Sequence, residues 1–197
     1  TLANYNSLLT ENSNLKEILG RKKEKAEMVL SVVLGKPSQT PYNTLIIDAG
    51  TVLGVKAGDM VFALGNVSIG RVSDTYSNSS KVVLFSTPGE KTEVVVGEGD
   101  VFMEVVGRGG GNFEMIVPRD FILLKGDMAI LPGIFPYAVA KVETIISDPR
   151  DPFIKALLVS PVNIKELKFV QVEKKYKFMN EFFQIESERL KLAYTES

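Results

Sequence analysis

The feature that most constrains the fold is a long run of short apolar segments separated by turn residues. Between Met28 and Lys174, segments rich in Val and Ile alternate with Gly, Asn, Asp and Pro. Such a pattern predicts short β-strands, and no helix-length periodic segment interrupts it, which favours a barrel or sandwich over a parallel α/β sheet. The twelve expected strands are Met28–Leu34, Thr44–Asp48, Met60–Ala63, Val67–Ser73, Lys81–Ser86, Glu93–Val96, Val101–Val106, Phe113–Val117, Met128–Leu131, Ala138–Ile146, Ile154–Val159 and Phe169–Glu173.

Two segments divide this region, because Pro and Gly interrupt strand pairing. They are Ser86–Glu90 and Asp148–Pro152. The fold class expected is mainly β, with two small six-stranded barrels, one inserted into the other. The first barrel is predicted to span residues 28–90 and to be completed by 153–173, and the second is predicted to span 91–152.

A helix is expected before the strands, over residues 1–27. Its apolar face follows the spacing three, four, three, four, with a polar residue at one position, through Tyr5, Leu8, Asn12, Leu15 and Leu19. This is the a/d pattern of a coiled coil, in which a lone Asn sets register and favours two strands. The segment is short, so an amphipathic helix that docks on its own domain remains an equal alternative.

The last segment, residues 174–197, is expected to be helical or flexible. Tyr176, Met179, Phe183 and Leu190 are spaced for one helix face. The tail could dock on the rest of the chain, pack against a partner or be partly disordered, and periodicity alone does not distinguish these.

The composition excludes several classes of function. The chain has 23 Lys and Arg against 24 Asp and Glu, a net charge of -1, and this is a poor match for a phosphate backbone. It has no His, the commonest general base near neutral pH, and no Cys for thiol chemistry or zinc. We therefore expect no enzyme, no cofactor, no metal site and no nucleic-acid partner.

Neither a membrane span nor a signal peptide is visible in the sequence. No window holds the roughly 20 apolar residues that a span requires, and no basic segment precedes an apolar one at the start. The sequence begins at Thr1, inside the predicted helix. We expect it to be a fragment whose natural N-terminus is missing.

Some short motifs resemble functional loops and have simpler interpretations. Asp48-Ala49-Gly50-Thr51 resembles a kinase phosphate loop or an aspartic-protease loop, but the second loop that each requires is absent, so Asp48 is expected to bond turn amides. Gly107–Gly111 follows a strand and precedes no helix, which indicates a hairpin loop. Lys56–Met60 and Lys125–Asp127 share a Gly-Asp turn, and this repetition indicates two related barrels.

An ordered series of motifs in this chain resembles the MreC family of rod-shape-determining proteins. The series comprises a Tyr-containing entry with Asp-x-Gly, then Gly-Val-x-x-Gly, Gly-x-Val, a Ser-Ser-Lys-Val-Val-Leu segment, Val-Pro-x-Asp, Gly-Asp and a segment that resembles the family's late Pro-x-Val-Asp. Together these cover about Leu8 to Val172, and they are Pro41–Gly50, Gly54–Val61, Val67–Val72, Ser79–Leu84, Ile116–Asp120, Gly126–Ile130 and Pro161–Asn163. The chain departs from the family at Leu131-Pro132-Gly133, where Thr-Ser-Gly is frequent, and at Tyr137–Ala140, which lacks two glycines.

The resemblance implies a non-catalytic scaffold of bacterial cell-wall elongation that helps to form and maintain cell shape. It implies one N-terminal helix in the inner membrane, missing here, with this portion on the extracytoplasmic, periplasmic side. It also implies self-association as a dimer or higher assembly, and contacts with a penicillin-binding transpeptidase, MreD, MreB and RodA. We expect Tyr5, Leu8, Asn12, Leu15 and Leu19 to mediate self-association. Phe135 and Tyr137 are candidates for partner binding.

Two other functions remain as alternatives. A membrane-fusion adaptor of an efflux or secretion system also joins helices to small β-domains, but it requires two long antiparallel helices. A carboxylate-dependent β-barrel hydrolase would act through Asp48.

Overall fold

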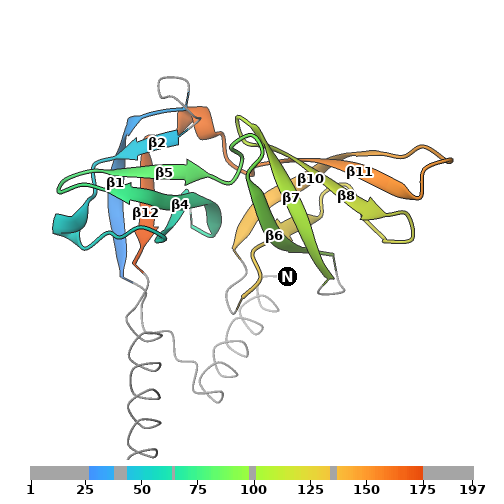
Figure 1. Ribbon diagram of the computed structural model, residues 1–197, viewed down its shortest axis with the longest axis horizontal. Helices are drawn as coiled ribbons and strands as arrows, with labels where there is room; N and C mark the ends of the chain where they lie inside the picture. Colours follow the sequence, from blue (N-terminus) through green and yellow to red (C-terminus); the bar gives the residue numbers. More distant parts are fainter. Residues whose placement is uncertain (1–26, 38–43, 64, 98–100, 134–136, 175–197) are drawn as a thin grey trace, which may run out of the picture. The chain divides into compact units, whose positions relative to one another are not determined.

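The fold was described from a computed structural model of the chain (Figure 1). The structure describes residues 27–37, 44–63, 65–97, 101–133 and 137–174, and all its strands belong to one compact unit, Met28–Lys175. Within these residues there are twelve strands, two short 3-10 helices and no α-helix. The strands are β1 (Met28–Gly35), β2 (Thr44–Ile47), β3 (Met60–Ala63), β4 (Val67–Thr75), β5 (Ser80–Leu84), β6 (Lys91–Val96), β7 (Val101–Gly109), β8 (Asn112–Pro118), β9 (Met128–Ile130), β10 (Ala138–Ile146), β11 (Phe153–Val159) and β12 (Phe169–Glu173).

The mainly β fold and the expected strands are confirmed. The 3-10 helices are η2 (Thr51–Leu53) and η3 (Ile164–Glu166), both in connections between strands. The helices expected at 1–27 and 174–197 fall almost entirely outside the described residues. No described helix is long and apolar enough to cross a membrane.

Six strands close the first barrel. Antiparallel pairs run in the order β1–β2–β5–β4–β3–β12 and return from β12 to β1. Alternate residues point inward, as in β5, where Ser80, Val82 and Leu84 are buried and the residues between them are partly exposed. The core is aliphatic and includes Leu45 and Val172, neither of which is exposed to solvent. Closure leaves no free edge on this barrel.

The other six strands form a second β unit with its own core. They pair antiparallel in the order β6–β7–β8–β11–β10–β9, and β9 pairs back to β6 through two residue pairs. This order repeats that of the first barrel, with β7 to β11 in place of β1 to β5 and β6 in place of β12. A single parallel residue pair, Ala138 with Val67, joins the two sets of strands.

The structure corrects the expected boundary at residue 153. Strand β11 pairs along its whole length with β8, so it belongs to the second β unit, and only β12 returns to the first barrel. The reason is that Asp148–Pro152 forms a hairpin turn, in which Asp151 N donates to Asp148 O at 3.0 Å. The Arg119 side chain also donates to two carbonyl oxygens of this turn, Asp148 O and Asp151 O. A short turn keeps β10 and β11 adjacent, so the chain passes back to the first barrel only after Val159.

The repeated Gly-Asp turn has the same hydrogen bonds in both places. Lys56 N donates to Asp59 Oδ2 and Leu124 N donates to Asp127 Oδ2, each at 2.8 Å. The glycines before these aspartates have φ of 90° and 102°, values that L side chains rarely adopt. The first turn leads into β3, which pairs with β4, and the second leads into β9, which pairs with β10. The relation between the two sets of strands that the sequence repeat indicated is therefore present in the structure.

Candidate interaction surface

The Asp48 carboxylate holds two strands together. Its Oδ1 accepts a hydrogen bond from Ser31 Oγ at 2.8 Å and another from Val32 N at 2.6 Å. These bonds lie beside the bulge where β1 changes register against β2. Asp48 was predicted to accept hydrogen bonds from amides of its own turn, and this prediction is wrong. Its donors lie on β1, sixteen and seventeen residues away in sequence.

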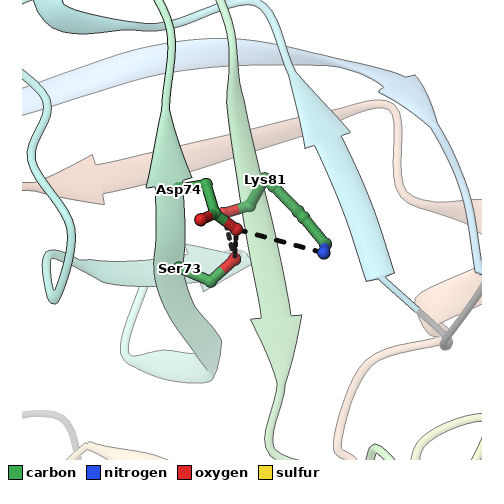
Figure 2. A network of polar contacts seen from close by, with 3 residues as sticks. All are labelled: Ser73, Asp74 and Lys81. Carbon is green, nitrogen blue, oxygen red and sulfur yellow. Dashed lines mark hydrogen bonds and ion pairs between the residues drawn. The ribbon is translucent and has the colours of Figure 1, made fainter.

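A Ser, an Asp and a Lys meet on the outer surface of β4 and β5 (Figure 2). Ser73 Oγ lies 2.9 Å from Asp74 Oδ2 and 3.2 Å from Lys81 O, and Lys81 Nζ lies 3.9 Å from Asp74 Oδ2. A catalytic Ser–Lys pair requires the Lys amine within hydrogen-bond distance of the Ser hydroxyl. Here the Lys81 amine faces the Asp74 carboxylate instead. The group marks the register shift between Val72 and Asp74, and an exposed ion pair of this kind contributes little to stability.

The described residues contain no cluster of His, Cys, Asp or Glu that could hold a metal ion. The glycine cluster lies partly in β7 and partly in its turn to β8. Gly107 N donates to Glu90 O, and Gly109 N donates to Ser86 O. The cluster therefore packs against the Ser86–Glu90 connection between the two sets of strands.

Tyr137 joins the two sets of strands. Its hydroxyl donates to Glu173 Oε1 of β12 at 3.0 Å, and its ring meets Phe62 of β3 edge-on, with centroids 4.6 Å apart. Burial, then the hydrogen bond to Glu173 and then its negative charge, raise the pKa of Tyr137 to about 12. Tyr137 is half-buried, and the contacts of its ring and hydroxyl are made within the chain. Phe135, the other candidate for partner binding, lies outside the described residues.

A row of exposed apolar residues lies on the first barrel. Every second residue of β1 points outward, and each of these is apolar and exposed. Phe169 of β12 lies opposite Val32 and is also exposed. We name this surface the outer apolar band, and define it as Met28, Leu30, Val32, Leu34 and Phe169.

The sequence contained a signal for this band. Six of the seven residues of Met28–Leu34 are apolar, so the strand reads as a continuous apolar run rather than an alternating one. A continuous run is typical of strands that are covered on both faces. The run predicts a strand, and the exposure of its outward face is evident only in the structure.

The second β unit carries exposed apolar residues beside a charged cluster. Ile116 and Phe153 are 59% and 50% exposed. Next to them, Glu114 accepts contacts from Arg108 at 3.2 Å and from Lys155 at 3.3 Å. On β8 and β11, charged residues therefore lie between the exposed apolar ones.

The residues predicted for self-association lie outside the described part of the chain. They are Tyr5, Leu8, Asn12, Leu15 and Leu19. Whether these five residues share one face is therefore not tested by the structure, and their role in self-association stays a prediction.

A closed barrel joined to a second β unit with its own core defines a β-rich, barrel-containing domain. Residues 33–174 match the family described as rod shape-determining protein MreC, barrel core. The match covers most of the sequence, and the chain belongs to the MreC family.

Solved structures share the fold. MreC from Pseudomonas aeruginosa is 23% identical with a TM-score of 0.67, over 74% of this chain and 98% of that chain. The major periplasmic domain of the cell shape-determining filament MreC is 15% identical with a TM-score of 0.56, over 74% of this chain and 94% of that one. MreC in complex with penicillin-binding protein PBP2 from Helicobacter pylori is 12% identical with a TM-score of 0.51, over 76% and 100%. No curated protein sequence matches the chain.

Proposed function

We propose that this chain is the extracytoplasmic part of a non-catalytic scaffold of the bacterial cell-wall elongation machinery. The observation that carries the proposal is the match of residues 33–174 to the MreC barrel core. In this role the protein helps to form and maintain cell shape. A single N-terminal helix anchors it in the inner membrane, and the β region lies on the periplasmic side. The periplasmic origin of a related domain supports this placement.

The proposed partners are a penicillin-binding transpeptidase, MreD, MreB and RodA. Support for the first comes from the Helicobacter pylori protein, whose structure was solved in complex with PBP2. Segment 1–27 is proposed to pair with a second copy through the Tyr5–Leu19 face. The membrane-fusion adaptor alternative has no observation in its favour.

We further propose that the chain has two β domains. The first comprises residues 28–90 and β12, and the second comprises residues 91–159, closed as a barrel of its own. The separate cores and the matching order of strand pairs support this division.

A pull-down from bacterial envelope extract, with the full chain as bait, tests the function. We expect mass spectrometry to recover a penicillin-binding transpeptidase above a bait-free control. Phe135→Ser should reduce recovery, whereas Ser73→Ala, at an exposed polar position on the first barrel, should leave it unchanged. A folded bait that recovers no transpeptidase would overturn the proposal.

A further inference from the structure

The outer apolar band lies on strands that have no free edge. Strand β1 pairs with β2 on one side and with β12 on the other, so a further strand cannot add to it. Its outward side chains are nevertheless uncovered, since Leu30, Leu34 and Phe169 are 67%, 60% and 57% exposed. Such a row of large apolar side chains is typical of an interaction surface. A binding segment would therefore contact the side chains of the band and not its backbone.

A pocket opens between the band and the covered side of the barrel, where Phe62 is 1% exposed and its ring contacts Tyr137. It has a volume of about 240 Å³ and is lined by Leu30, Phe62, Gly65, Phe169, Val170 and Gln171. A cavity of roughly 150 Å³ is enough to hold a benzene ring. The pocket therefore has room for one large apolar side chain.

Lysines gather at the Leu34 end of the band. Lys36 follows β1, and its Nζ donates to Lys165 O at 2.9 Å. Lys168 lies just before β12, and its carbonyl oxygen accepts a hydrogen bond from Val33 N at 2.9 Å. Lys165 and Lys168 are both exposed. These contacts hold the three lysines within reach of a segment bound on the band.

Glu166 and Asp48 place negative charge near these lysines. Glu166 is exposed and belongs to the same 3-10 helix, η3, as Lys165. The Asp48 carboxylate is engaged within the barrel, because it accepts hydrogen bonds from Ser31 and Val32 of β1. The Leu34 end is therefore positively charged, and a positive patch favours an acidic partner.

We propose that the outer apolar band binds an amphipathic helix of a partner protein, with one large apolar side chain in the pocket and acidic residues at the Leu34 end. Residues four positions apart on one helix face are separated by about 6 Å along the axis. The outward residues of β1 are spaced by about 6.6 Å, two strand residues at about 3.3 Å each. A helix of about three to four turns that runs along β1 therefore matches the band in spacing and length.

The pocket favours a peptide over a lipid surface as the occupant. A face that binds a membrane inserts its own apolar side chains into the bilayer. A recess that fits a single side chain is instead typical of a protein interface, where large apolar residues anchor in pockets. This binding goes beyond the proposed function, which assigns no partner to the band.

Fluorescence anisotropy with a labelled probe peptide tests the binding to the full chain. The probe is an amphipathic helix of about 16 residues, with Leu and one Phe on one face and several Glu in the last turn. We expect saturable binding that Leu30→Ser with Phe169→Ser weakens about tenfold or more, because these residues line the pocket. The control Ile116→Ser changes a residue that is 59% exposed but lies on β8, and it should leave the affinity unchanged.

Reversal of charge tests the acidic end of the helix. A second probe carries Lys in place of each Glu of the first. Lys165→Glu with Lys168→Glu should weaken binding of the acidic probe several-fold and strengthen binding of the basic probe. If both probes bind equally to the wild type and to this variant, the lysines do not select an acidic partner and the proposal is wrong on that point.

Three results would overturn the proposal as a whole. The first is a wild-type chain that does not bind the acidic probe at millimolar concentration, or binds it no better than the Leu30→Ser, Phe169→Ser chain. The second is binding to phosphatidylglycerol vesicles that these substitutions abolish, which would show that the band meets a membrane. The third is a dimer that they convert to a monomer in sedimentation, which would show that a second copy covers the band. No transpeptidase takes part in these measurements, so the proposed function is tested separately.

Discussion

At the scale of single residues, two glycines of the first barrel are required by close approach of neighbouring backbone. A Cβ atom on Gly50 would lie 2.7 Å from Ser77 O, and one on Gly70 would lie 2.9 Å from Leu84 Cα. Neither glycine is among those with positive φ. Because these glycines belong to the Asp-x-Gly and Gly-x-Val motifs, the motifs have a packing explanation that requires no ligand.

Gly70→Ala should therefore destabilise the protein. The methyl group would meet backbone of β5, which cannot move aside without breaking its ladder, and overpacking of this kind costs about 1–3 kcal/mol. Urea unfolding followed by circular dichroism measures the change. Gly65→Asn is the control, because Gly65 has φ of 73°, which Asn tolerates, and nothing lies within 4 Å of its added Cβ. Equal stability of Gly70→Ala and wild type would contradict this packing.

Asp48→Ala should destabilise the protein by about 1–3 kcal/mol, because hydrogen bonds to a charged group are among the stronger ones. Asp48→Asn keeps an acceptor oxygen for Ser31 and Val32, and should cost less. The midpoint of urea unfolding measures both. If Asp48→Ala were as stable as wild type, the carboxylate would not hold β1 against β2, and a chemical role would again need consideration.

At the scale of elements, the two Gly-Asp turns differ in burial despite their shared hydrogen bonds. Asp59 is 2% exposed, whereas Asp127 is only partly buried. When the carboxylate is removed, a partly buried backbone N–H group is left without an acceptor, which costs free energy of desolvation. A more exposed N–H group can form a hydrogen bond with water instead.

Asp59→Ala should accordingly destabilise the protein more than Asp127→Ala, by about 2 kcal/mol against about 1 kcal/mol. Thermal unfolding of the two variants checks the order. Equal effects would show that the two turns are equally accessible to water once the carboxylate is gone.

The junction of the two sets of strands predicts a pH dependence. The pKa of Tyr137 is raised from 10.0 to about 12, so its neutral form is favoured in the folded state. Its contribution to stability is fully present below pH 10 and falls as the pH rises toward 12, because the unfolded chain ionises first. Tyr137→Phe should unfold more readily at pH 8, since the bond to Glu173 is lost.

Between pH 10 and pH 12, the stability of Tyr137→Phe should also decline less than that of the wild type. The two proteins differ only at residue 137, so the difference between their pH profiles reports on that side chain. Urea unfolding at pH 8, 10 and 11.5 makes the comparison, and parallel pH profiles would contradict the bond to Glu173.

At the scale of the whole molecule, the proposed pairing of segment 1–27 predicts a change of oligomeric state. Leu8→Asp with Leu15→Asp should convert a dimer to a monomer in sedimentation, because burying each Leu in such a seam contributes roughly 1.5–3 kcal/mol. Arg21→Asp, outside the seam, is the control. A wild-type chain that is monomeric at high concentration would rule out the pairing for this chain.

The strands could be predicted because they depend on local pattern. Alternation of apolar residues and the turn residues between them are read within a few positions, and all twelve expected strands are present. Which strands pair is set by contacts distant in sequence, and there the prediction failed at β11. The segment before β11 has the Pro-containing pattern of a boundary, yet it folds as a hairpin turn that accepts hydrogen bonds from Arg119, the residue that follows β8.

The sequence by itself determined the class of fold, the family and the absence of thiol and imidazole chemistry, because composition and motif order are properties of the chain alone. Only the tertiary structure decided which polar and apolar groups meet. It brought the Asp48 carboxylate into hydrogen-bond contact with β1, joined the Tyr137 hydroxyl to Glu173 and turned one side of β1 outward. These depend on barrel closure, which gives a strand an inner and an outer face and joins residues that no local pattern connects.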